Sequence, residues 1–243
     1  MDPSYPAVPA RRRRRWPWAL LVTLVVLVGL LVAADRVALG FAEDKAAAAL
    51  QSSQHLQQPP DVSVLGFPFL TQLAAGEFGE VTVTADDIGV GTDRSLTLQK
   101  VVVDMHHVTV SDNYRSVHAA TATADATVSY AELSRVLGTP ISNGGNGRLE
   151  ARPSVQLLGN TFHGTVSAVV HVSSARGITF GDPKVDVAGV SVPSVVVDSL
   201  AKVFRVTIPL SGLPFGVRVT GLSVVSAGVV LKLAGSDLTY RRG

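Results

Sequence analysis

The chain opens with sharply contrasting polar and apolar blocks. Residues 1–10 are Pro-rich and predict disorder, and five consecutive arginines, Arg11 to Arg15, follow them. An uncharged apolar stretch then runs from Trp16 to Ala34. As a helix it would span about 28 Å, close to the ~30 Å hydrocarbon core of a bilayer. The pattern predicts a disordered basic cytoplasmic tail at 1–15 and one transmembrane or signal helix at 16–34.

The charges that flank this stretch predict its orientation. Arginines precede it, whereas Asp35-Arg36 follows it, so the positive-inside rule keeps the N-terminus cytoplasmic. The protein is then a single-pass protein of the cell membrane, with its body on the periplasmic, extracytoplasmic side. A cleaved signal peptide is the alternative, because Val32-Ala33-Ala34 offers small residues for cleavage. The length of the apolar run favours an anchor, and both interpretations export the body.

Helical patterns in the body are few. Apolar residues at helical spacing predict helices at 36–53, 129–137 and about 193–204. Ser129 and Glu132 form a capping box, in which each side chain can satisfy a backbone N–H. In the last helix, one apolar face combines Val197, Leu200 and Phe204.

Most of the remaining chain alternates β-branched or small apolar residues with polar ones. Strands are expected at 81–84, 95–110, 115–129, 165–172, 185–192, 217–225 and 229–233. Turn signals lie at 112–113, 143–147, 159–160, 181–183 and 234–235. Several strands exceed the usual five or six residues. The sequence therefore predicts an α+β fold: a long, strongly curved antiparallel sheet wrapped with a few helices, forming one body over 36–243.

Composition narrows the function classes. Apolar residues make up 47% of the chain, charged residues only 16%, and there is no cysteine, so disulfides and thiolate metal sites are excluded. Of 21 Lys and Arg, six lie in residues 1–36, and of 19 Asp and Glu, two lie there. The body at 37–243 therefore carries 15 basic and 17 acidic residues, which gives no basis for nucleic acid binding.

Catalytic and cofactor motifs are missing from the sequence. It holds no Gly-x-Ser-x-Gly elbow and no phosphate-binding Gly-x-x-x-x-Gly-Lys loop. His106 and His107 are adjacent in a strand and point to opposite faces, and the acidic residues Asp86, Asp87 and Asp93 suit a solvated turn. We therefore expect no enzyme activity, no cofactor and no metal site.

Some apolar positions remain to be explained. Val101-Val102-Val103 is a consecutive apolar run, expected to be buried on both faces or turned toward a cavity. The segments 65–70 and 210–215 are apolar loops around a proline. These loops either plug the ends of the sheet or form a rim that contacts lipid or membrane.

One family resemblance rests on a distinctive segment. The run Gly-Phe-Pro-Phe-Leu-Thr-Gln at 66–72, followed by Gly-Glu-Phe-Gly-Glu-Val-Thr-Val at 76–83, resembles the actinobacterial LmeA family of phospholipid-binding proteins. Tyr-Ala-Glu-Leu at 130–133 and Leu-Pro-Phe-Gly-Val-Arg-Val at 213–219 occur in the family's order. The resemblance covers about residues 36–243.

The resemblance implies a tubular lipid-binding fold like that of bactericidal/permeability-increasing proteins. It also implies an envelope protein that binds phospholipids, phosphatidylinositol types included, and that supports envelope glycolipid or mannan assembly. No catalytic residue carries over. The alternative function is a non-enzymatic scaffold that binds an envelope biosynthetic enzyme at the membrane. The expected lipid-contacting residues are Phe67, Phe69, Leu70, Phe78, Val197, Leu200, Phe204, Leu213 and Phe215.

Overall fold

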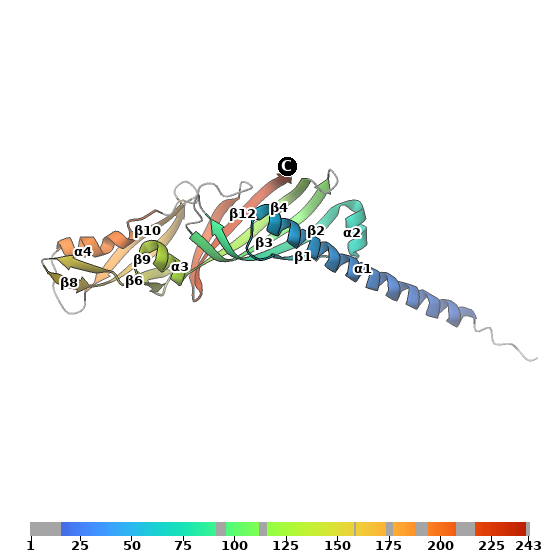
Figure 1. The fold of residues 1–243 in the computed structure, drawn as a ribbon, viewed down its shortest axis with the longest axis horizontal. Helices are drawn as coiled ribbons and strands as arrows, with labels where there is room; N and C mark the ends of the chain where they lie inside the picture. Colours follow the sequence, from blue (N-terminus) through green and yellow to red (C-terminus); the bar gives the residue numbers. More distant parts are fainter. Residues whose placement is uncertain are drawn as a thin grey trace, which may run out of the picture.

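A long helix projects from one end of an elongated molecule (Figure 1). The computed structural model describes residues 16–90, 96–111, 116–157, 159–173, 177–187, 194–207 and 217–241. Helix α1 extends over Trp16–Gln54, so the helical patterns at 16–34 and 36–53 form one continuous helix. Because neither Pro nor Gly separates them, nothing interrupts the backbone hydrogen bonds at Asp35.

The larger sheet is antiparallel and has six strands in the order β1-β2-β3-β4-β12-β11. Four of its strands are 14 to 16 residues long, which confirms the expected long strands. Its edges, β1 and β11, do not pair with each other, so the sheet is open. The strands are β1 (Asp61–Leu65), β2 (Glu77–Val90), β3 (Leu96–Ser111), β4 (Ser116–Ser129), β11 (Arg218–Val225) and β12 (Gly228–Arg241).

A smaller sheet occupies the end of the molecule opposite the projecting helix (Figure 1). Its order is β10-β9-β6-β5, and β7 and β8 form a separate hairpin. These strands are β5 (Ile141–Asn143), β6 (Arg148–Ala151), β7 (Ser154–Leu157), β8 (Asn160–His163), β9 (Thr165–Ser173) and β10 (Gly177–Asp186). The short helices are α2 (Phe69–Ala75), α3 (Tyr130–Leu137) and α4 (Ser194–Ala201), with the 3-10 turn η1 (Lys202–Phe204). The α+β class is confirmed.

Several local expectations are wrong. The turn signal at 234–235 lies inside β12, and the one at 181–183 lies inside β10, where the register shifts between Gly181 and Lys184. Asp86 and Asp87 belong to β2 rather than to a turn. The last two residues of the apolar loop expected at 65–70, Phe69 and Leu70, begin helix α2 instead. In each case long-range strand pairing or packing overrides a local residue preference.

In four of the long strands, the alternation of inward-facing and outward-facing residues shifts by one position. The four shifts lie side by side, along a line that crosses the sheet. Phe78 and Val81 of β2 are both buried, although strict alternation would place them on opposite faces. The same shift occurs in β3, β4 and β12, at mutually opposite positions. On this line His107 and Asp237 adopt positive φ angles of 52° and 55°. A residue with a positive φ angle changes the direction of its strand. The sheet therefore bends along this line, while the pairing register of the strands is kept.

Two apolar clusters pack on the inner face of the larger sheet. The anchor-end core joins α1 and α2 to β1–β4, and small α1 side chains such as Ala42 and Ala46 allow the helix to lie close to the strands. The far-end core joins the other end of the same face to α3, α4 and the smaller sheet. The two cores thus lie at opposite ends of one continuous apolar face.

Candidate functional site

The segment 66–72 is a compact corner before α2. Gly66 has a φ of 111°, and a Cβ there would come within 2.6 Å of the Gln72 side chain. Gln72 Oε1 accepts a hydrogen bond from the Gly79 N–H at 3.2 Å. Phe69 is 2% exposed and stacks on Phe78, with ring centroids 6.2 Å apart. Phe69 of this motif therefore contributes to the anchor-end core, while Gly66 and Gln72 shape the corner.

Two carboxylates of α1 bind this corner and the strand before it. Asp35 Oδ1 accepts a hydrogen bond from the Leu70 N–H at 2.8 Å, and Glu43 Oε1 accepts one from the Val64 N–H at 2.8 Å. The first serves the N-terminus of α2, where Pro68 offers no side-chain cap. The second satisfies a backbone donor of the edge strand β1. The two bonds thereby link α1 to α2 and to β1.

Four expected lipid-contacting residues meet at this end, in two different environments. Phe69 and Phe78 are buried, whereas Phe67 and Leu70 are exposed by 58% and 40%. The Arg36 guanidinium lies 5.1 Å from the centroid of the Phe67 ring. This end of the molecule therefore combines two rings that fill the core, Phe69 and Phe78, with an exposed apolar surface.

Three further expected residues lie at the opposite end of the molecule (Figure 1). Leu200 and Phe204 are buried in the far-end core, and Phe180 packs against Phe204 with ring centroids 5.1 Å apart. Val197 is half-buried, and Val196 takes the buried position of α4 instead. The structure thus does not bring α4 and the 66–72 segment into one site. Leu213 and Phe215 lie outside the described residues.

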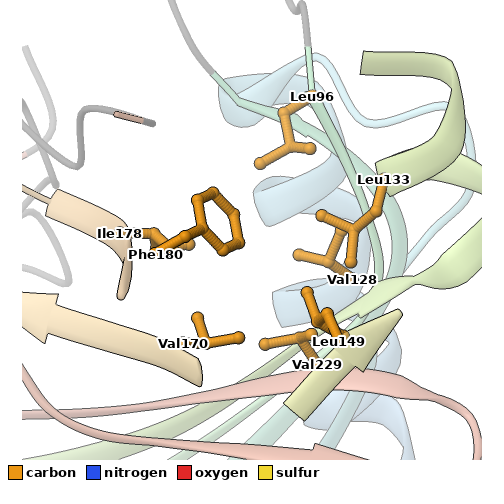
Figure 2. A pocket seen from close by; sticks show the side chains of 8 residues that line it. All are labelled: Leu96, Val128, Leu133, Leu149, Val170, Ile178, Phe180 and Val229. Atoms are coloured by element: carbon orange, nitrogen blue, oxygen red, sulfur yellow. The ribbon is translucent and has the colours of Figure 1, made fainter. Parts of the chain in front are cut away.

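The small cavity between the two sheets is almost filled (Figure 2). Leu96, Val128 and Leu133 face Ile178 and Phe180 across it. Its volume is about 10 Å³. That is close to the minimum for a single water molecule. An acyl chain does not fit there without side-chain movement.

The inner face between the two cores is less completely covered. Val103 is half-buried, and among the described residues it belongs to neither core. Register places Val83 on one side of it and Ala124 on the other, while Ala85 lies opposite Val101. We call these five half-buried residues the central band. They are Val83, Ala85, Val101, Val103 and Ala124, of which Val83 packs against the anchor-end core and Val101 and Ala124 pack against the far-end core.

The sequence signalled this band only in part. The run at 101–103 suggested burial on two faces or a cavity, but Val102 lies on the outer face, opposite Thr84 and Asp125. The alternation at 81–84 marked one apolar face. Which part of that face remains uncovered depends on where α1 ends and where the smaller sheet begins.

Polar chemistry in the described residues is mainly structural. Glu132 Oε1 accepts a hydrogen bond from the Thr97 N–H at 2.7 Å, and its carboxylate pairs with Arg135. The bond to Arg135 is the largest cause that lowers the pKa of Glu132 from 4.5 to about 2. The predicted capping box is confirmed only in part. Ser129 Oγ accepts a hydrogen bond from the Glu132 N–H, but the Glu132 carboxylate accepts one from the Thr97 N–H of β3. No group of three or more His, Asp or Glu that could hold a metal occurs in the part of the chain described.

Together the fold and its inner face define an α+β protein with an open antiparallel sheet that is apolar on one side. A family model described as LmeA-like phospholipid-binding matches residues 33–234. The chain belongs to this family, which confirms the resemblance and supports phospholipid binding. No curated protein and no solved structure matches the chain.

Proposed function

We propose that this protein is a membrane-tethered phospholipid-binding protein of the cell envelope, and that acyl chains lie along the central band. The band is the observation that carries the proposal, because it is a half-buried apolar strip where the two cores meet, and Val103 at its centre belongs to neither core among the described residues. Small residues such as Ala85 and Ala124 leave room above the strands. Each buried CH₂ contributes about 0.8 kcal/mol.

An open band suits a protein that exchanges lipid. The enclosed cavity of about 10 Å³ is too small for an acyl chain. A chain lying on the sheet surface needs no opening of the far-end core, and its head group can stay in water. Head-group selection, with phosphatidylinositol types as the family-based expectation, would then occur outside the sheet. Binding of this kind uses no catalytic group.

The N-terminal helix supports the tethered form of the proposal. The helix portion from Trp18 onward is long and apolar enough to cross a membrane, with a mean hydropathy of 2.4 over its most apolar window and only 6% of that window buried. Five arginines precede it, which keeps the N-terminus in the cytoplasm and the body outside. Support of envelope glycolipid or mannan assembly is the wider role that the family resemblance suggests.

Photo-crosslinking tests the binding site. The full chain is reconstituted in vesicles that contain a phospholipid with a diazirine on its acyl chain, and crosslinked peptides are identified by mass spectrometry. We expect crosslinks at Val83, Val103 and their neighbours in the central band. Ala124→Trp, which fills the band, should reduce these crosslinks several-fold. Thr123→Trp, on the exposed outer face of the same strand, is the matched control and should leave them unchanged.

Two outcomes would contradict the proposal. Crosslinks confined to Trp18–Ala34 would show only the lipid that surrounds the anchor, and would favour a scaffold that binds an envelope enzyme. Equal losses in Ala124→Trp and Thr123→Trp, with both variants folded by circular dichroism, would place the lipid elsewhere.

A further inference from the structure

Exposed apolar side chains surround α1 where it enters the body. Phe41 is 65% exposed, and Val37, also on α1, is more exposed still. Leu65, Phe67 and Leu70 come from the adjoining corner. We call these five residues the collar. Two cations accompany them: Arg36 lies over the Phe67 ring, and the Lys45 ammonium lies 5.3 Å from the Phe41 centroid.

Hydrogen bonds fix the level of the collar along α1. The Asp35–Leu70 bond and the Arg36–Phe67 contact hold the corner beside residues 35 and 36 of the helix. At 1.5 Å per residue these positions lie within about 3 Å of Ala34, the last residue of the uncharged apolar stretch. Val37 lies about 5 Å beyond Ala34 and Phe41 about 10 Å beyond it.

The bilayer provides the matching environment at this level. The head-group region beyond the ~30 Å hydrocarbon core adds roughly 5–7 Å on each side. If Trp16–Ala34 spans the core, Phe67, Leu70 and Val37 lie in that region. Aromatic rings and arginine or lysine side chains favour it, because it offers both apolar contacts and phosphate oxygens.

The continuity of α1 prevents the body from moving away. No flexible residues separate the membrane segment from the residues that hold the corner, since the helix passes through Asp35 without a break. A single rigid helix therefore presents the collar to the same bilayer that it crosses. Other exposed apolar residues, such as Val195 and Val206, lie at the far end of the molecule, away from the apolar stretch of α1.

We propose that Val37, Phe67 and Leu70 of the collar, together with Arg36, insert into the head-group region of the leaflet from which α1 emerges, and that Phe41 and Lys45 lie beyond it. This inference rests on the proposed membrane anchoring, and it adds a second contact that fixes the orientation of the body. The anchor-end of the inner face is then held against this leaflet. The body therefore stays next to the leaflet from which it would take phospholipid.

Single-cysteine variants test the insertion, because the chain has no cysteine and each probe would be unique. The full chain is labelled with an environment-sensitive fluorophore at Phe67→Cys or Leu70→Cys and placed in vesicles of phosphatidylcholine and phosphatidylglycerol. Val195→Cys and Val206→Cys are matched controls, since their exposures of 52% and 44% are similar to those of the two collar residues. We expect nitroxide lipids to quench the collar probes and aqueous iodide to quench the controls. Collar probes that respond to iodide as strongly as the controls would overturn the inference.

A functional comparison separates this inference from the proposed lipid site. Phe67→Asp/Leu70→Asp should lower crosslinking of the central band by bilayer lipid several-fold, and should leave crosslinking by micelle-dispersed lipid unchanged. Val195→Asp/Val206→Asp should change neither. If the wild-type band is not crosslinked by any lipid while the collar probes are quenched by nitroxide, the proposed site fails and the collar stands. Undiminished transfer from the bilayer in the collar variant would contradict the role of the collar in loading.

Discussion

The Asp35 carboxylate, in the middle of α1, accepts a hydrogen bond of 2.8 Å from the backbone N–H of Leu70 in α2. Asp35 is only 2% exposed, and its second oxygen lies 4.0 Å from Arg36 Nε. Among the described residues this oxygen has no hydrogen-bond partner. The bond connects α1 to the corner that carries Phe67 and Leu70.

Removal of this carboxylate should destabilise the body. Asp35→Ala leaves the Leu70 N–H without its acceptor, which should lower the free energy of unfolding by about 1–3 kcal/mol. Asp35→Asn keeps an acceptor and should lose less. Thermal unfolding of the full chain in detergent micelles measures the effect. Asp44→Ala, an exposed position on the same helix, is the control, and equal losses at positions 35 and 44 would refute the prediction.

The far-end core gives a test that separates packing from lipid contact. Leu200 is fully buried, and its Cδ1 lies 2.7 Å from where a Cβ on Gly164 would stand. Leu200→Ala should cost about 2–5 kcal/mol of stability. Val197→Ala, at a half-buried position of the same helix, should cost clearly less. We expect the folded fraction of both variants to bind phospholipid as the unmodified protein does. Loss of binding by the folded fraction of either variant would show that α4 contacts the lipid.

The Glu132 carboxylate predicts an acid-dependent loss of stability. Its pKa is about 2 in the folded protein, below the usual 4.5, so its contribution is fully present above about pH 4.5. The contribution is lost as the pH falls from 4.5 toward 2, because the folded carboxylate must then be protonated. Unfolding midpoints from pH 6 to pH 2 should therefore fall less steeply in Glu132→Gln. Glu150→Gln, which removes a carboxylate paired with Arg152, is the comparison, and an unchanged slope in Glu132→Gln would contradict the assignment.

The hairpin between β11 and β12 should tolerate no side chain at Gly228. This residue has a φ of 152°, and a Cβ there would collide with the carbonyl oxygen of Val128 on β4. Gly228→Ala should destabilise the sheet by about 3 kcal/mol or more. Gly221→Ala in the same hairpin meets only an ordinary contact, 3.8 Å from the Lys232 Cβ, and should be nearly neutral. Chemical unfolding of the two variants side by side decides the point.

The local sequence pattern determined much of the architecture. The apolar run at 16–34 predicted the helix that projects from the body, and alternation over 95–129 predicted strands β3 and β4 within a few residues. The segment at 66–72 led to the family. These features depend on neighbouring residues only: helix length, side-chain alternation and a distinctive motif.

Only the tertiary structure decided which apolar residues enter the two cores. The sequence placed Phe69, Phe78, Leu200 and Phe204 among the lipid-contacting residues because large apolar side chains in a core and in a binding site look alike. Long-range packing buries all four, at opposite ends of the molecule. It leaves Val103 half-buried between the two cores and Phe67 exposed beside Arg36. The reason is physical: hydrophobicity drives burial, but the positions of α1 and the smaller sheet determine which apolar residues remain accessible to a ligand.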